Sequence, residues 1–167
     1  MEKEYQEVTW ESLSKSLVAL RKEYRNLLKF TSWKKGENEA FCWQIAEVVN
    51  KFLRTKQGLK SHIMTGTYTG RGTEFSGGKN GTGHFWVEFW GKAPLGLDNK
   101  EYTLIIDGAY AQFYPKYTPE PIKNKVRLMF FFDDPIAQDW YRGSIDNCGE
   151  HIRVRRNNEE ELPTSTS

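Results

Sequence analysis

Apolar residues recur at steps of three and four residues along the first third of the chain, which is the spacing of one face of an amphipathic helix. The first such stripe consists of Trp10, Leu13, Leu17, Leu20, Tyr24, Leu27 and Leu28. Thr9 precedes it and is a suitable N-cap. A polar stretch with a glycine at residues 33–38 predicts a loop. A second stripe, formed by Phe41, Ile45, Val48, Val49 and Phe52, then predicts a helix that ends near Gly58.

After Gly58 the pattern changes to short runs rich in aromatic and β-branched residues. Those runs predict four strands, at residues 59–68, 84–90, 102–107 and 126–132. The intervening segments predict loops, one of them glycine-rich, at residues 69–83, 91–100 and 114–121, and residues 135–141 predict a short helical turn. Because helices come first and strands afterwards, we expect an α+β domain with N-terminal helices packed on an antiparallel β-sheet.

The length of 167 residues suits one domain, which we place at residues 1–156, followed by a polar tail at 157–167 that we expect to be disordered. The chain is 38% hydrophobic and 28% charged, as in soluble globular proteins, and it has no apolar run long enough to span a bilayer. The N-terminal residues lack the features of a secretory signal. We therefore expect a cytoplasmic protein without a membrane partner.

The charge balance argues against a nucleic-acid partner, and the cysteine content argues against a structural zinc site. The net charge of +2 comes from 24 basic and 22 acidic residues that are mixed along the chain, which argues against a nucleic-acid partner. A cytosolic setting keeps thiols reduced, so Cys42 and Cys148 are considered separately. Cys148 and His151 offer two potential zinc ligands, whereas a structural zinc site needs four. We expect neither a metal nor a cofactor.

Cys42 falls in the first turn of the second predicted helix. Unpaired backbone N–H groups and the helix dipole stabilise a negative charge there, which favours the thiolate that attacks carbonyl carbon. The alternative is that Cys42 is a small buried hydrophobic residue.

His84 opens a strand directly after the glycine-rich segment, a position that suits a general base. Asp107 ends another strand, where a carboxylate must be hydrogen-bonded or paired because burying it alone is costly. If the two strands are neighbours, Asp107 can hold the imidazole in the tautomer that accepts the thiol proton. Considered alone, His84 can be explained as a structural histidine and Asp107 as a turn residue. Together with Cys42, they favour a catalytic triad.

Three motifs carry a resemblance to a known family. They are Phe41-Cys42-Trp43 at a helix start, Gly83-His84-Phe85-Trp86-Val87-Glu88 on a strand, and Ile105-Ile106-Asp107-Gly108-Ala109 at the end of the next. Over roughly residues 38–113 the sequence resembles the transglutaminase-like branch of the papain-like cysteine enzymes, which includes the arylamine N-acetyltransferases. The resemblance implies a papain-like α+β fold in which Cys42 is the nucleophile, His84 the base and Asp107 the orienting carboxylate.

These residues predict a thiol-dependent acyl-transfer enzyme that acts on a protein, a peptide or a small amide. The short chain favours hydrolysis of the Cys42 thioester. One alternative is a transglutaminase or acyltransferase that passes the acyl group to an amine. The other is a non-catalytic protein-interaction domain on the same fold, against which the intact residues at all three triad positions argue.

The residues around the triad have more open roles. The backbone N–H of Cys42 is the natural first oxyanion donor, and Gln44, Asn38 and Trp33 are candidates for a second. Gln112 is instead a candidate for a supporting hydrogen bond. Glu88 shares the strand face of His84, and a solvated strand charge is its simpler interpretation. The neighbouring aromatic residues, Trp43, Phe85, Trp86, Tyr110, Phe113 and Tyr114, are more typical of core than of a substrate cleft.

Overall fold

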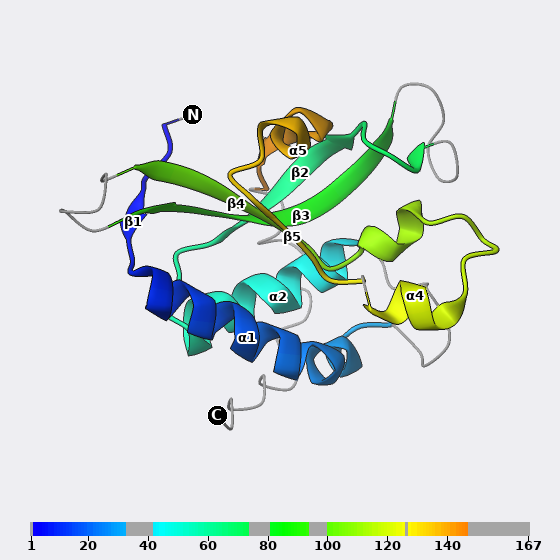
Figure 1. The fold of residues 1–167 in the computed structure, drawn as a ribbon, viewed down its shortest axis with the longest axis horizontal. Helices are drawn as coiled ribbons and strands as arrows, with labels where there is room; N and C mark the ends of the chain where they lie inside the picture. Colours follow the sequence, from blue (N-terminus) through cyan, green and yellow to red (C-terminus); the bar gives the residue numbers. More distant parts are fainter. Residues whose placement is uncertain (1, 33–41, 74–80, 94–99, 126, 147–167) are drawn as a thin grey trace.

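The computed structural model describes residues 2–32, 42–73, 81–93, 100–125 and 127–146. Within these residues the chain has an α+β fold built on a six-stranded sheet (Figure 1). The strands are β1 (Gln6–Glu7), β2 (His62–Tyr68), β3 (Thr82–Lys92), β4 (Glu101–Asp107), β5 (Met129–Phe132) and β6 (Tyr141–Ile145). They lie in the order β5-β4-β3-β2-β6, with antiparallel ladders, and β1 adds to β3 in parallel.

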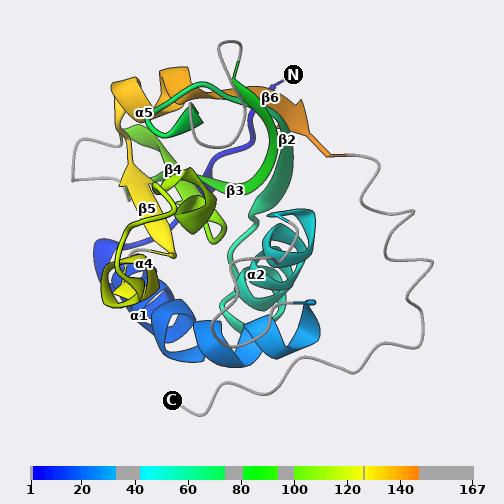
Figure 2. The same cartoon turned by 90° about the vertical axis from the view of Figure 1, so that its right-hand side faces the viewer.

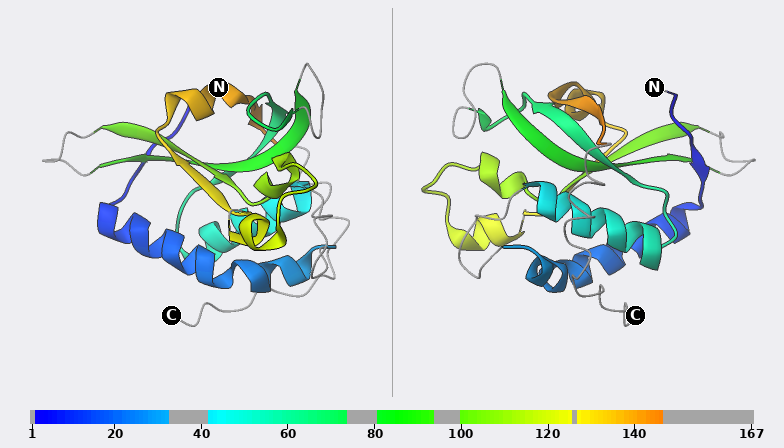
Figure 3. Two further views of the ribbon diagram at one scale, coloured as in Figure 1. Left: turned by 45° about the vertical axis from the view of Figure 1, so that its right-hand side comes forward. Right: turned by 180° about the vertical axis from the view of Figure 1, so that it is seen from behind.

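The two long helices cover one face of this sheet. The helical segments are α1 (Trp10–Leu27), η1 (Leu28–Phe30), α2 (Cys42–Lys56), η2 (Tyr110–Phe113), α4 (Glu120–Lys125) and α5 (Pro135–Trp140). Figure 2 shows α1 and α2 next to each other below the sheet, with α5 on the opposite side, and both views of Figure 3 show the same separation. The expected packing of N-terminal helices on an antiparallel sheet is therefore confirmed.

Both predicted helices form where their apolar stripes place them. Thr9 caps α1, because its Oγ1 accepts a hydrogen bond of 3.1 Å from the Ser12 N–H. Helix α2 ends just before Gly58, whose φ of +69° is the left-handed conformation that glycine adopts at helix ends. The loop predicted at 33–38 and Phe41 lie outside the described residues.

The four predicted strands are present with shifted ends, whereas β1 and β6 were not predicted. Strand β1 is only two residues long, and β6 has the exposed middle Arg142-Gly143-Ser144 instead of an alternating apolar pattern. Their backbone pairing with β3 and β2 specifies them, and that is a tertiary property. Strand β3 also continues to Lys92, so the loop expected from residue 91 starts later. Helix α4 begins within the loop expected at 114–121.

The sheet separates two apolar clusters of different character. Alternation along β3 places Val87 and Phe89 toward α1 and α2, among mainly aliphatic residues. The opposite face is mainly aromatic; its buried members are Met64, Tyr68, Trp86, Trp90, Ile105, Phe113, Ala137 and Tyr141. No helix in the described part of the chain is long and apolar enough to cross a membrane.

Candidate active site

Cys42, His84 and Asp107 come from the ends of three elements. Cys42 is the first residue of α2, His84 lies near the start of β3, and Asp107 is the last residue of β4. Strands β3 and β4 are antiparallel neighbours, with Val87 opposite Ile106. The strand pairing on which the role of Asp107 depends is therefore present.

The turn after Asp107 is held against both long helices. A Cβ added at Gly108 would lie only 2.5 Å from Ile45 Cγ2, so glycine is what allows α2 to approach this closely. The hydroxyl of Tyr24 on α1 donates to the Gly108 carbonyl. Burial raises the pKa of Tyr24, which keeps this donor protonated. The end of β4 is thus fixed relative to the helix that begins with Cys42.

The carboxylate of Asp107 is surrounded by hydrogen-bond donors. His84 Nε2 lies 2.8 Å from Asp107 Oδ2, and both side chains are 0% exposed. The Tyr141 hydroxyl donates to the same oxygen at 2.7 Å, and the Ala109 N–H donates to Oδ1 at 2.9 Å. This donor set suits an ionised carboxylate, which only accepts. Nε2 of His84 therefore carries a proton, and Nδ1 is the ring nitrogen that gains or loses one.

The ionisation of His84 follows from two opposing effects. Burial lowers its pKa, but the charge and hydrogen bond of Asp107, assisted by a hydrogen bond and the charge of Cys42, outweigh burial and raise it to about 9. Asp107 holds Nε2, so Nδ1 is the ring nitrogen that remains to exchange a proton with the nearby Cys42. Cys42 itself is half-buried.

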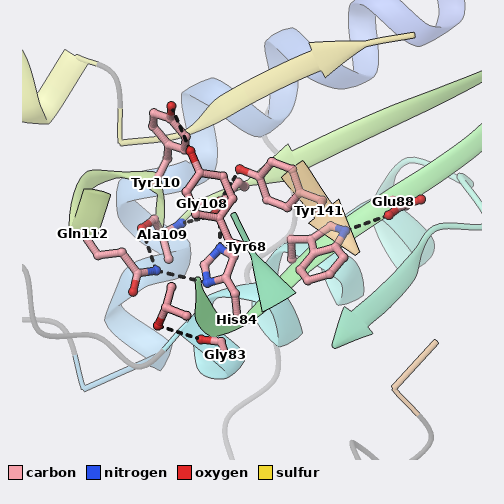
Figure 4. A network of polar contacts seen from close by, with 12 residues as sticks. Tyr68, Gly83, His84, Glu88, Gly108, Ala109, Tyr110, Gln112 and Tyr141 are labelled. Carbon is pink, nitrogen blue, oxygen red and sulfur yellow. Dashed lines mark hydrogen bonds and ion pairs between the residues drawn. The ribbon is translucent and has the colours of Figure 1, made fainter. Parts of the chain in front are cut away.

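Gln112, on η2, makes a further contact with the imidazole. Its Nε2 lies 3.1 Å from His84 Nδ1 and 3.1 Å from the carbonyl oxygen of Ala109 (Figure 4). The expectation that Gln112 makes a supporting hydrogen bond near the triad is confirmed. Its contact is with the nitrogen on the thiol side, which the sequence did not indicate.

Aromatic rings enclose the remaining sides of His84. Phe113 presents its edge with ring centroids 5.1 Å apart, and Trp86 stacks at 6.0 Å. Tyr68 and Tyr141 lie at 6.1 Å. These rings restrict the orientation of the imidazole and exclude water, which strengthens its electrostatic interactions. Trp86 and Phe113 are buried, as expected for core aromatics.

The interpretation of Glu88 as a solvated charge is wrong. Its side chain faces the aromatic side of the sheet and only 6% of the residue is exposed. Its carboxylate accepts hydrogen bonds from the indole N–H of Trp86 at 2.7 Å and of Trp90 at 3.0 Å. Both tryptophans lie two residues from Glu88 on the same strand face, a spacing that is visible in the sequence.

Of the side chains considered as a second oxyanion donor, Gln44 alone lies within the described residues. Gln44 Oε1 accepts hydrogen bonds from the backbone N–H and the hydroxyl of Ser32, at 2.9 and 2.8 Å, and so links α2 to the end of the first helical region. Trp33, Asn38, Cys148 and His151 lie outside the described residues.

The sequence did not indicate the role of Tyr141, because Tyr141 follows a helical turn and its contact with Asp107 spans 34 residues. Among the described residues, no cluster of His, Cys, Asp and Glu is arranged to hold a metal.

No family model, curated protein or solved structure matches the chain. The interpretation of this site therefore depends on its own geometry and chemistry.

Proposed function

We propose that this protein is a cysteine-dependent acyl-transfer enzyme that hydrolyses an amide bond through a thioester on Cys42. One observation carries the proposal: the buried imidazole of His84 lies 2.8 Å from Asp107 through Nε2, and Cys42 is near enough to raise its pKa. A thiol, a base and a carboxylate that orients the base are the parts of a cysteine nucleophile.

The position of Cys42 supports its role as the nucleophile. It begins a helix of 15 residues, where backbone N–H groups without helical acceptors and the helix dipole stabilise a thiolate. The elevated pKa of His84 supports an imidazolium partner near neutral pH. Cys42 is half-buried, whereas His84 is only 1% exposed.

In the proposed acylation, the proton of the Cys42 thiol moves to His84 Nδ1 and the thiolate attacks the substrate carbonyl carbon. A C–S bond forms while the π pair moves to oxygen. The tetrahedral intermediate collapses, the C–N bond breaks, and the Nδ1 proton transfers to the leaving nitrogen. The amine leaves and a thioester remains on Cys42.

Deacylation uses the same residues in reverse. His84 Nδ1 takes a proton from water as its oxygen attacks the thioester carbon, and the C–S bond then breaks to release a carboxylic acid. An amine in place of water gives a new amide by the same steps. Asp107 keeps Nε2 protonated throughout, so the reacting proton is always at Nδ1.

We propose further that the fold is of the papain-like type. The support is architectural: the helix that begins with the candidate nucleophile packs on the strand that carries the candidate base, and the neighbouring strand supplies the carboxylate. A fold of this type hosts several acyl-transfer reactions, so the substrate must be found by experiment.

The first test measures thiol reactivity. Cys42 is expected to react with iodoacetamide at pH 7 at least about 10-fold faster than Cys148, because an imidazolium favours its thiolate. Peptide mapping after timed labelling separates the two sites. His84→Ala should slow the labelling of Cys42. His62→Ala is the matched control, because His62 stacks on Trp90 instead of contacting the triad, and it should label like the wild type.

The second test identifies the reaction. Wild type and Cys42→Ala are compared on peptide amides, on glutamine side-chain amides and on p-nitrophenyl acetate, each with and without added hydroxylamine. Turnover that requires Cys42 supports the proposal, and diversion of product to the hydroxamate identifies the thioester. The proposal is wrong if both cysteines are labelled equally and wild type and Cys42→Ala do not differ on any substrate. The alternative of a non-catalytic interaction domain would then remain.

A further inference from the structure

The amide group of Gln112 has only one acceptable orientation. The atom facing the Ala109 carbonyl oxygen at 3.1 Å must be nitrogen, because an amide oxygen there would oppose another acceptor. That same nitrogen lies 3.1 Å from His84 Nδ1. Gln112 therefore directs one N–H at Ala109 and the other at the imidazole, as the dashed lines in Figure 4 show.

This contact is compatible with only one charge state of His84. A neutral imidazole protonated at Nε2 has a lone pair at Nδ1 and accepts the Gln112 N–H. Once the thiol proton has moved to Nδ1, that nitrogen becomes a donor and cannot accept. The Gln112 hydrogen then loses its acceptor at the moment at which the Cys42 thiolate forms.

The released hydrogen lies beside the reacting atoms. Asp107 holds Nε2, so Nδ1 is the nitrogen left to exchange a proton with Cys42, and the Gln112 amide adjoins the space that a carbonyl group bonded to Cys42 must enter. Gln112 is half-buried, whereas His84 is only 1% exposed. An oxyanion forming there is a stronger acceptor than the carbonyl oxygen that it replaces.

We propose that Gln112 is a catalytic oxyanion donor, whose Nε2–H donates to His84 Nδ1 while the imidazole is neutral and to the substrate oxygen while His84 is protonated. The proposal rests on the proposed acyl-transfer function. It involves an exchange of hydrogen bonds, and no covalent bond to Gln112 forms or breaks.

Two reactions of Cys42 separate oxyanion stabilisation from thiolate formation. Alkylation by iodoacetamide displaces iodide at a saturated carbon and forms no oxyanion, so it reports thiolate reactivity. Acetylation by p-nitrophenyl acetate forms an oxyanion, and p-nitrophenolate leaves without needing a proton. The ratio of the acetylation rate to the alkylation rate therefore measures oxyanion stabilisation, independently of proton donation by His84.

Gln112→Met and Gln112→Glu are the test variants. Methionine has similar length and no N–H, and an ionised glutamate has nearly the same shape but only accepts. Both are expected to acetylate about 100-fold more slowly than wild type, the usual loss for one oxyanion donor. Alkylation at pH 6 should be unchanged in both variants, because it forms no oxyanion. Gln57→Met is the control, because Gln57 lies beyond the far end of α2, about 22 Å from Cys42 along the helix axis.

The outcomes are distinguishable. A fall of both reactions by the same factor in Gln112→Met and in Gln112→Glu would show a structural role, and unchanged acetylation would show that Gln112 is not a donor; either result overturns the proposal. Failure of the acyl-transfer function looks different: wild type and Cys42→Ala would then release p-nitrophenolate at the same rate.

Discussion

Two carboxylates, Asp107 and Glu88, are buried on the same face of the sheet. Glu88 lies on β3 opposite Ile105, two residues before Asp107 on β4. Neither residue is more than 6% exposed, and each carboxylate accepts hydrogen bonds through both of its oxygens. Burial and hydrogen bonding therefore do not tell them apart.

The partners differ in chemistry. Glu88 accepts from the indoles of Trp86 and Trp90, which are 1% and 2% exposed and whose N–H groups do not ionise near neutral pH. Asp107 accepts from His84, which can gain or lose a proton and contacts the thiol of Cys42. A candidate active site is thus distinguished from polar core by whether the hydrogen-bond network leads to a titratable, reactive group.

The largest expected effect separates the two carboxylates by rate. Asp107→Asn should slow Cys42 acetylation by p-nitrophenyl acetate about 10²- to 10⁴-fold, because asparagine does not hold the Nε2-protonated tautomer. Glu88→Gln should change that rate by less than about 3-fold, yet lower the free energy of unfolding by about 1–3 kcal/mol, since one indole N–H loses its acceptor.

Initial rates and urea unfolding of both variants check this contrast. If Glu88→Gln slowed acetylation as much as Asp107→Asn, the distinction between the two carboxylates would be wrong.

The next effect concerns pH. The pKa of His84 is raised from 6.5 to about 9 in the folded protein. Because the folded value is the higher one, the stabilisation is complete below pH 6.5 and disappears as the pH rises through 9. An increase of this size corresponds to about 3 kcal/mol in the free energy of unfolding.

Urea unfolding at pH 6 and pH 10 measures this stabilisation. The difference in stability between wild type and Asp107→Asn should shrink at the higher pH, whereas the difference between wild type and Glu88→Gln should stay constant. A pH-independent difference for Asp107→Asn would mean that Asp107 does not stabilise the imidazolium.

The smallest effect isolates one donor to Asp107. Tyr141→Phe removes the hydroxyl that donates to Oδ2 at 2.7 Å, and should lower the free energy of unfolding by about 1–3 kcal/mol because the acceptor is charged. Tyr102→Phe is a matched control: the buried Tyr102 hydroxyl has no hydrogen-bond partner among the described residues, so its loss should be neutral or stabilising. Thermal unfolding compares them, and equal destabilisation would contradict a specific role for Tyr141.

Much of this fold is determined by patterns that act over a few residues. The stripe after Thr9, the glycine after α2 and the aromatic runs specify helices and strands locally, because helical and extended backbones bury residues with different periods. The positions of Cys42, His84 and Asp107 at the ends of those elements were visible in the same way. Their meeting was a prediction that depended on strand pairing.

The sequence alone did not determine which polar side chains would share that face. Glu88 was expected in water, although β3 is covered on both sides and Glu88 faces two indoles. Tyr141 reaches Asp107 and Gln112 reaches His84 through contacts that span 34 and 28 residues. Tertiary packing decided these contacts, because a polar group has no fixed partner until burial removes water as the alternative.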